Sequence, residues 1–275
     1  MGYRRILTIQ DISCVGQCSM TVALPIMSAC GHEVCILPAA VLSTHTGGFG
    51  TPAAVKLGSW MEKAVSHWKE NGIAFDLISV GYLGSLEAVE LANYIMDTML
   101  APGGITVVDP ALADHGKVYS GLTDEYCDAM FRLCERADVI LPNITEAAMM
   151  AKHPYREQYD EDYVGDLLER TPGKDVLLTG VGFAPGETGF AIRTGGQILY
   201  HTHPKLPKNY SGTGDIFAAA FCGALASEKE ITEAGKIAAQ FTLQCIENTA
   251  ASPAHWYGVK FETALRDLMD MISKA

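Results

Sequence analysis

The stretch Ser211-Gly212-Thr213-Gly214-Asp215, which leads directly into the apolar run Ile216 to Leu225, decides how the rest of the chain is interpreted. Glycines let the backbone come close to a ligand, and the start of the following helix offers unpaired N–H groups to an anion. Asp215 stands one step further along as a candidate general base. The alternative is an ordinary helix start, because Gly and Asp commonly occur there. Other segments have to decide between these two interpretations.

The composition is that of an ordinary folded protein. Of the 275 residues, 48% are hydrophobic and 19% are charged, which fits one large α/β domain or two small ones. The net charge of −12 argues against nucleic acid as a partner. No apolar run approaches the ~18 to 20 residues that span a bilayer, and the N-terminus turns polar too early for a signal peptide. We therefore expect a cytoplasmic protein that binds small molecules and no membrane.

Two of the cysteines could have a role other than packing in the core. Cys14 and Cys18 have the spacing C-x-x-x-C, which would suit a metal or redox role. No second cluster of Cys or His supplies the remaining ligands of a zinc site, and the other cysteines lie mostly in apolar segments. Buried free thiols that pack as small hydrophobic groups are therefore the expected outcome.

Short apolar, β-branched runs alternate with longer helical patterns, which predicts a mostly parallel sheet with helices on both faces. The expected strands are Arg4 to Ile9, Glu33 to Leu37, Leu77 to Val80, Ile105 to Val108, Val139 to Leu141 and Val176 to Leu178. The expected helices are Met20 to Cys30, Ala53 to Glu70, Leu86 to Met99, Asp124 to Glu135, Glu161 to Arg170, Ile231 to Asn248 and Phe261 to Ser273. Gly189 to Thr194 and Gln197 to His203 predict a hairpin through Gly195-Gly196. No linker divides the sequence, so we expect a single domain over residues 1–275.

Ligands of such sheets bind outside the carboxyl ends of the strands, and the residues expected there are rich in polar groups and glycine. They are Gln10-Asp11, Ser43 to Gly48, Gly81 to Gly84, Asp109-Pro110, Pro142 to Glu146 and Thr179-Gly180.

Taken in order, these motifs resemble the ribokinase-like superfamily, and specifically its pyridoxal (vitamin B6) kinase branch. The motifs are I-Q-D at 9–11, L-S-T-H-T-G-G at 42–48, G-Y-L-G-S at 81–85, V-D-P at 108–110, P-N-I-T-E at 142–146 and G-T-G-D at 212–215. The resemblance implies the superfamily's three-layer sandwich. It also implies ATP-dependent phosphorylation of the 5′-hydroxymethyl group of pyridoxal, pyridoxine or pyridoxamine, in the salvage of pyridoxal 5′-phosphate.

The resemblance also implies roles for the G-T-G-D motif. Asp215 matches the base that takes the hydroxyl proton, and the N–H groups of Gly212, Thr213 and Gly214 match the anion hole for the transferring phosphate. The physics agrees, because a loose phosphoryl transition state needs positioning and charge neutralisation more than covalent chemistry.

On the nucleotide side, the resemblance implies roles for Asp109, Asn143, Glu146 and Thr179. Asn143 and Glu146 match an N-x-x-E motif that organises the Mg²⁺ shell, and Asp109 matches an acidic residue near the metal, with contacts to Mg²⁺ largely through water. The alternative makes Pro142-Asn143 a strand-ending turn and Glu146 a solvated acid of a first helical turn. A monovalent-cation requirement stays open.

For the vitamer, the matching positions are Asp11, His45, Thr46, Gly47 and Tyr82. His45 can hydrogen-bond a ring oxygen, and the face of Tyr82 suits a flat pyridine ring. A lone loop His is usually solvated and a lone Tyr usually packs in the core, but both follow adjacent strands here. We also expect Ser43 to Thr51 to be a mobile flap with Phe49 as its apolar lid, and the resemblance favours a homodimer that meets near the Thr46 loop.

The chain departs from the family pattern at Asp11, Leu141 and Thr179. Typical pyridoxal kinases have Ser after I-Q, so Asp11 adds a negative charge that would favour pyridoxamine, unless it only caps the turn through the N–H of Ser13. Leu141 and Thr179 leave nucleotide preference open.

Three further alternatives stay in view. Hydroxymethylpyrimidine kinases of thiamin synthesis share G-T-G-D, but their N-terminal G-S-D-S-G-G-G type of loop is absent. A non-catalytic vitamer-binding protein would not need Asp215, Asn143 and Glu146. A dehydrogenase would need G-x-G-x-x-G after the first strand, which is also absent.

Overall fold

The computed structural model describes residues 2–208, 210–252 and 254–274, and the chain divides into two compact units. The first unit comprises Met1–Ile105 with Lys208–Ala275, and the second comprises Thr106–Pro207. Strand β5 (Leu100–Val108) begins in the first unit and ends in the second. The expectation of one domain over the whole chain stays a prediction.

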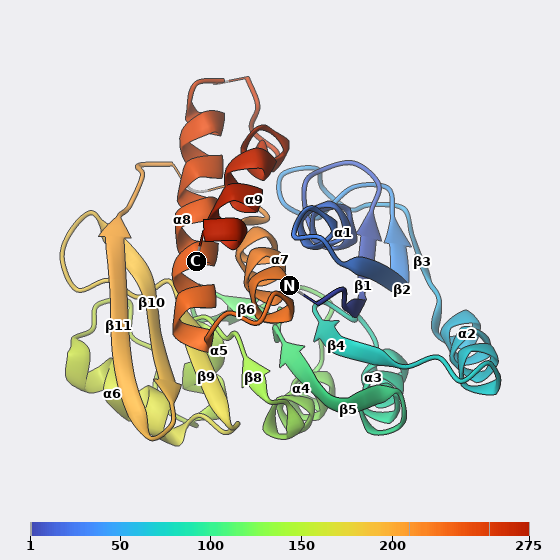
Figure 1. The fold of residues 1–275 in the computed structure, drawn as a ribbon. Coiled ribbons are helices and arrows are strands. Elements are labelled where there is room, and N and C mark those ends of the chain that lie inside the picture. The colour runs from blue at the N-terminus through green and yellow to red at the C-terminus, as the bar shows by residue number, and fades with distance from the viewer. Residues whose placement is uncertain (1, 209, 253, 275) are drawn as a thin grey trace. The chain divides into compact units, whose positions relative to one another are not determined.

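Within the described residues, the strands form a nine-stranded sheet with the order β11-β10-β9-β8-β5-β4-β1-β2-β3 (Figure 1). The pairs β1–β2, β1–β4, β5–β8 and β8–β9 are parallel. The other strands of this sheet are β1 (Arg5–Ser13), β2 (Glu33–Leu42), β3 (Ala54–Lys56), β4 (Phe75–Val80), β8 (Val139–Ile140), β9 (Asp175–Thr179), β10 (Glu187–Thr194) and β11 (Gln197–Pro204). The expected mostly parallel sheet is confirmed.

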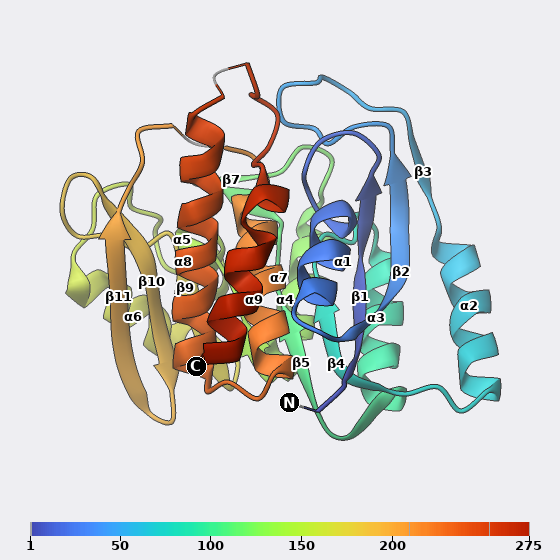
Figure 2. The same ribbon diagram turned by 45° about the horizontal axis from the view of Figure 1, so that its top comes forward.

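In the first unit, α1 and α7 cover one face of the strands, while α2 and α3 cover the other (Figures 1 and 2). The central strand β1 is buried on both faces, with Ile6, Leu7 and Ile9 fully buried, as its continuous apolar run requires. The helical segments of this unit are α1 (Met20–Ala29), α2 (Gly58–Glu70), α3 (Leu86–Thr98), α7 (Thr213–Ala226), α8 (Ile231–Ala250), η1 (Phe261–Ala264) and α9 (Leu265–Lys274).

The second unit contains α4 (Asp124–Arg136), α5 (Ile144–Met150), α6 (Glu161–Arg170) and a small hairpin of β6 (Ala113–Asp114) and β7 (Lys117–Val118). The predicted β10–β11 hairpin is confirmed, with Thr194 paired to Gln197. Gly195 and Gly196 have φ of +57° and +78°, the left-handed conformation that a two-residue hairpin turn needs at both positions.

The structure corrects the expected helix Ala53 to Glu70 at its start. Residues 54–56 form β3, which pairs antiparallel with β2, and the helix begins only at Gly58. Extended backbone is favoured here by Pro52 and by the β-branched Val55. The extended segment can then pair with the open edge of strand β2.

Three further differences concern the ends of elements and small elements. The last predicted helix is divided into η1 and α9. Strand β1 extends to Ser13, so Gln10-Asp11 lies inside the strand and not after it. The helix α5 and the β6–β7 hairpin were not predicted. No described helix is both long enough and apolar enough to cross a bilayer.

Candidate active site

The candidate site of the first unit begins at the N-terminus of α7, where Gly212 is the N-cap residue with φ +82°. A Cβ atom at Gly212 would collide with the carbonyl oxygen of Gln17 and would lie 3.1 Å from the Sγ of Cys18. Only glycine therefore permits the β1–α1 loop to lie against this helix start. Gly212 also has no side chain with which to cap the first-turn N–H groups, and these groups carry the positive end of the helix dipole.

Asp215 is the third residue of α7 and is partly buried. Burial raises the pKa of Asp215 to about 6, and the charge of Asp11 raises it as well. Hydrogen bonds from the N–H of Ser19 and from the thiol of Cys18 lower it. A carboxylate with such a pKa is ionised at neutral pH and is a stronger proton acceptor than an exposed Asp, which suits a general base.

Asp11 is 3% exposed, and its Oδ2 accepts a hydrogen bond of 3.0 Å from the hydroxyl of Ser13. Burial raises the pKa of Asp11, while the hydroxyls of Ser19 and Ser13 lower it. Ser13 donates to Asp11 through its side-chain hydroxyl. The alternative, in which Asp11 only caps the turn by accepting from the backbone N–H of Ser13, is therefore not seen.

His45 is 6% exposed, and both of its ring nitrogens have partners inside the protein. Its Nε2 lies 2.7 Å from the carbonyl oxygen of Tyr257, and its Nδ1 lies 3.0 Å from the N–H of Gly47. Nδ1 accepts and Nε2 donates, so the ring is neutral in this arrangement. His45 thus holds its loop in place, while Thr46 and Gly47 are the exposed residues that follow it.

Phe49, at the tip of this loop, packs against a segment that the sequence analysis missed. Its ring centroid lies 4.8 Å from that of Trp256 and 5.8 Å from that of Tyr257. A Cβ atom at Gly48 would lie 2.7 Å from the Trp256 ring. The three rings, which we call the lid cluster, hold the expected flap against the chain that follows α8. In the sequence, only the two aromatic residues that follow His255 indicated this contact.

Tyr82 lies in the loop after β4 and is half-buried. Gly84 has φ +68°, and a Cβ atom there would lie 3.0 Å from the Cε1 of Tyr82, so glycine makes room for the ring. Burial raises the pKa of Tyr82, and the charge of Asp11 raises it further, so the phenol stays a neutral hydrogen-bond donor at physiological pH.

In the first unit, several of the residues predicted for the vitamer and the anion hole lie near one another. Asp11 acts electrostatically on both Tyr82 and Asp215. A Cβ atom at Gly47 would lie 2.7 Å from the Oγ of Ser211, so the loop lies next to the start of α7.

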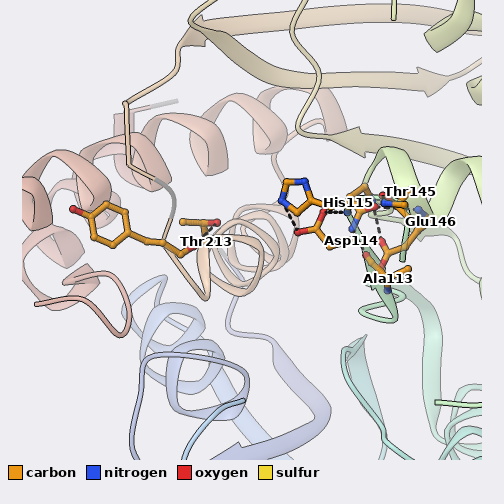
Figure 3. A network of polar contacts seen from close by, with 9 residues as sticks. Ala113, Asp114, His115, Thr145, Glu146 and Thr213 are labelled. Atoms are coloured by element: carbon orange, nitrogen blue, oxygen red, sulfur yellow. Dashed lines mark hydrogen bonds and ion pairs between the residues drawn. The ribbon is translucent and has the colours of Figure 1, made fainter. Parts of the chain in front are cut away.

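In the second unit, Asn143 and Glu146 form a capping box at the start of α5. The Oδ1 of Asn143 accepts from the N–H of Glu146 at 3.0 Å, and Oε2 of Glu146 accepts from the N–H of Asn143 at 2.9 Å. Oε1 of Glu146 accepts from the N–H groups of Leu112 and Ala113 at 2.9 and 3.3 Å. Figure 3 shows Glu146 beside Ala113 on the β6 hairpin. Glu146 is 1% exposed, so the alternative of a solvated acid is wrong.

Asp109 and Thr179 lie at the ends of two other strands of this unit. Asp109 is half-buried, and its Oδ1 accepts from the N–H of Ala111 at 3.2 Å. The N–H of Thr179 donates to the carbonyl of Pro142 at 2.9 Å, and Thr179 forms a β-bridge with Asn143. The structure thus places Thr179 directly beside Asn143.

The predicted magnesium shell does not fit Glu146 as it lies here, whereas the roles of the half-buried Asp109 and Asn143 in it stay predictions. Mg²⁺ needs accessible oxygen ligands or carboxylates that can reach its bound water. Both carboxylate oxygens of Glu146 accept backbone N–H groups, and burial closes this side chain to water. The described residues contain no cluster of three or more His, Cys, Asp or Glu side chains that could hold a metal ion.

We predict that Trp256→Ala loosens the flap, because it removes the ring packed on Phe49 and Gly48. Chymotryptic cleavage next to Phe49 should be several-fold faster in the variant. The control is Trp60→Ala on α2, since Trp60 and Trp256 are both 49% exposed. Equal cleavage rates in the two variants would show that the lid cluster does not hold the loop.

We predict that Glu146→Gln lowers the free energy of unfolding by about 1 to 3 kcal/mol, because the amide would turn an NH₂ group toward a backbone donor. Urea unfolding measures it, with the exposed Glu169→Gln of α6 as the control. If the two variants are equally stable, the carboxylate does not organise the hairpin.

Comparisons with known proteins agree with this geometry. A family model described as phosphomethylpyrimidine kinase matches residues 59–259. Over 264 residues, the chain is 27% identical to the pyridoxine/pyridoxal/pyridoxamine kinase of Bordetella bronchiseptica, with 89% of each chain covered.

Solved structures agree as well. The crystal structure of pyridoxal kinase from Lactobacillus plantarum matches with a TM-score of 0.89 at 33% identity, over 98% of each chain. A structure from Bacteroides thetaiotaomicron, named a "putative phosphomethylpyrimidine kinase" and in a crystal form with pyridoxal, matches with a TM-score of 0.88 at 31% identity, over 97% of this chain and 96% of that chain. The chain therefore belongs to the phosphomethylpyrimidine kinase family of the ribokinase-like superfamily, and its resemblance to the pyridoxal kinase branch is confirmed.

Proposed function

We propose that this protein is an ATP-dependent kinase that phosphorylates the 5′-hydroxymethyl group of pyridoxal, pyridoxine or pyridoxamine. The observation that carries the proposal is the start of α7. There, a glycine-initiated helix presents its first N–H groups, and Asp215 has a pKa raised to about 6 by burial. Two of the relatives named above, a pyridoxine/pyridoxal/pyridoxamine kinase and a pyridoxal kinase, support the substrate class.

In the proposed reaction, Asp215 takes the proton of the hydroxymethyl group. The oxygen then forms a new bond to the γ-phosphorus of ATP, and the bond from that phosphorus to the β,γ-bridging oxygen breaks, which releases ADP. The N–H groups of Gly212, Thr213 and Gly214 stabilise the charge on the transferring group. They are fixed by the helix, so they need no reorganisation during the reaction.

We propose that Asp11, Thr46, Gly47 and Tyr82 contact the vitamer. The role of His45 changes from the expected one. Because both its nitrogens are used inside the protein, it supports the binding loop and leaves ligand contacts to Thr46 and Gly47. The neutral phenol of Tyr82 offers its ring face and its hydroxyl.

We propose that the second unit binds the nucleotide through the region of Asp109, Asn143 and Thr179. Glu146 contributes by fixing the segment that follows Asp109, through the N–H groups of Leu112 and Ala113. Mg²⁺, when bound with ATP, would neutralise phosphate charge. No step proposed here depends on coordination by Asn143 or Glu146.

A homodimer and a cytoplasmic location remain proposals that rest mainly on the sequence. The edge strand β3 supports an interface, since all its residues are exposed and Val55 is 54% exposed.

A second candidate substrate is hydroxymethylpyrimidine, and the description of the matching family model favours it. The glycine-rich N-terminal loop typical of those kinases is absent, and Ile9 to Ser13 lie in strand β1 instead. A vitamin B6 vitamer is therefore preferred over hydroxymethylpyrimidine as the substrate.

The test is ADP release with pyridoxal, pyridoxine, pyridoxamine and hydroxymethylpyrimidine as acceptors. We predict that kcat/KM for at least one vitamer exceeds that for hydroxymethylpyrimidine by about tenfold or more, which corresponds to about 1.4 kcal/mol of transition-state binding. The highest value for hydroxymethylpyrimidine would contradict the proposal. So would vitamer binding without release of ADP, which would indicate a binding protein.

A further inference from the structure

The segment that follows α8 touches the candidate site through the loop that carries His45. The carbonyl oxygen of Tyr257 lies 2.7 Å from the Nε2 of His45, and the ring of Trp256 packs on that of Phe49. Residues 255–258, which we call the clasp, therefore contact the expected flap both through the backbone and through aromatic rings. The position of the flap depends on what holds the clasp.

Gln17, in the β1–α1 loop, holds the clasp with both ends of its amide. Its Nε2 donates to Oε1 and Oε2 of Glu262 at 2.9 and 3.0 Å, and its Oε1 lies 2.7 Å from the Nε2 of His255. An ionised carboxylate only accepts, so the NH₂ group of Gln17 faces Glu262, and the amide oxygen accepts from His255. One side chain thus joins the β1–α1 loop to the start of the clasp and to η1.

The other end of the clasp lies directly on Gln17. A Cβ atom at Gly258 would be 2.8 Å from both the Cβ and the Oε1 of Gln17, so glycine permits this approach. Beyond it, the N–H of Lys260 donates to the Oγ1 of Thr249 at 2.8 Å, and its Nζ donates to the Oγ of Ser252 at 2.7 Å. The clasp is therefore anchored to the end of α8 on one side and to Gln17 on the other.

The backbone around Gln17 contacts the two halves of the candidate site. A Cβ atom at Gly212 would collide with the carbonyl oxygen of Gln17, and a Cβ atom at Gly16 would collide with the ring of His45. The N–H of His45 also donates to the carbonyl of Val15 at 3.2 Å. The β1–α1 loop thus lies against both the start of α7 and the loop expected to bind the vitamer.

We propose that Gln17 is a positioning residue for vitamer binding. Its amide holds the clasp against the β1–α1 loop, and the clasp holds the flap through His45 and Phe49. Thr46 and Gly47 are thereby kept next to the start of α7. The inference rests on the proposed function, in which these two residues contact the vitamer.

The physical reason is the cost of ordering a loop. A flap that contains Gly47, Gly48 and Gly50 loses much backbone freedom when it becomes fixed. If the clasp has already ordered the flap, this cost is met during folding, and the vitamer binds more tightly. Loss of the clasp should therefore weaken vitamer binding. The chemical step depends on Asp215 and on the N–H groups of α7, so it should change little.

The experiment compares vitamer binding and turnover in the wild-type protein and in Gln17→Met, which keeps an unbranched side chain but removes both hydrogen bonds. We expect the Kd and the KM of the best vitamer to rise about tenfold, since one of the lost bonds is made to a charged group. The kcat at saturating vitamer should stay within about twofold. Calorimetry and steady-state kinetics measure these values.

The matched control is Gln244→Met on α8. Gln244 is also half-buried in the first unit, and its Nε2 donates to the Oδ1 of Asn248 at 3.0 Å. The control should leave the Kd of the vitamer within about twofold of the wild type. An unchanged Kd in Gln17→Met would overturn the inference, and so would a fall in kcat with an unchanged KM.

Two further variants separate positioning from a general loss of structure. Glu262→Gln keeps an acceptor oxygen for Gln17 and should retain most of the affinity, whereas Glu262→Ala should weaken binding as Gln17→Met does. If Gln17→Met does not fold, Glu262→Ala provides the measurement in its place. Equal affinities of Glu262→Gln and Glu262→Ala would contradict the proposal.

A double-mutant cycle tests whether Gln17 acts through the clasp. Combining Gln17→Met with Trp256→Ala should raise the Kd of the vitamer by less than the product of the two single effects, because both changes release the same segment. An effect equal to that product would mean that the two residues act independently, which overturns the inference.

A last readout needs no vitamer. Chymotryptic cleavage next to Phe49 should be several-fold faster in Gln17→Met than in Gln244→Met, and equal rates would overturn the inference. If the wild-type protein binds and phosphorylates no vitamer, the proposed function fails on that result alone. The cleavage rates then still decide whether Gln17 holds the flap, so the two failures are distinguishable.

Discussion

The absence of a side chain at Gly212 is the constraint on which the site of the first unit depends. The β1–α1 loop comes so close to this residue that any Cβ atom would strike the carbonyl of Gln17, and the positive φ excludes most other residues as well. The close approach places Cys18 and Ser19 around Asp215. It also leaves the first N–H groups of α7 without a cap from the N-cap side chain. One glycine thus creates both the anion-binding helix start and the environment of its base.

Much of the fold could be predicted, because periodicity and strand ends are local properties of the sequence. The alternation of short apolar runs and helices gave the parallel sheet, and Gly195-Gly196 gave the hairpin turn. The spacing of Asn143 and Glu146 is also that of a capping box, so α5 could have been found. The sequence could not predict the contact of Glu146 with Leu112 and Ala113. This contact buries the carboxylate. Burial by a distant segment makes this acid a structural acceptor in place of the expected metal shell.

The same limit applies to the first unit. His45 is a polar loop residue by pattern, but a tertiary contact with Tyr257, which is distant in the sequence, engages its second nitrogen. Asp11 was placed after a strand because polar residues usually end strands, yet its hydroxyl partners allow it inside β1. Whether a polar side chain is buried depends on whether its polar atoms find hydrogen-bond partners in the folded protein. Where they do, a carboxylate can be buried with its pKa raised, and this is the state that a base needs.

The central claim is that Asp215 is the proton acceptor of a vitamer kinase, and Asp215→Asn tests it most directly. The substitution preserves the shape of the side chain and the N–H groups of α7 but removes the basic oxygen. The account predicts that kcat with the best vitamer falls by roughly 10² to 10⁴, while the dissociation constant of the vitamer, measured by calorimetry, stays within a few fold. A variant that retains more than about a tenth of the wild-type kcat would contradict it, since such a loss is smaller than a general base contributes.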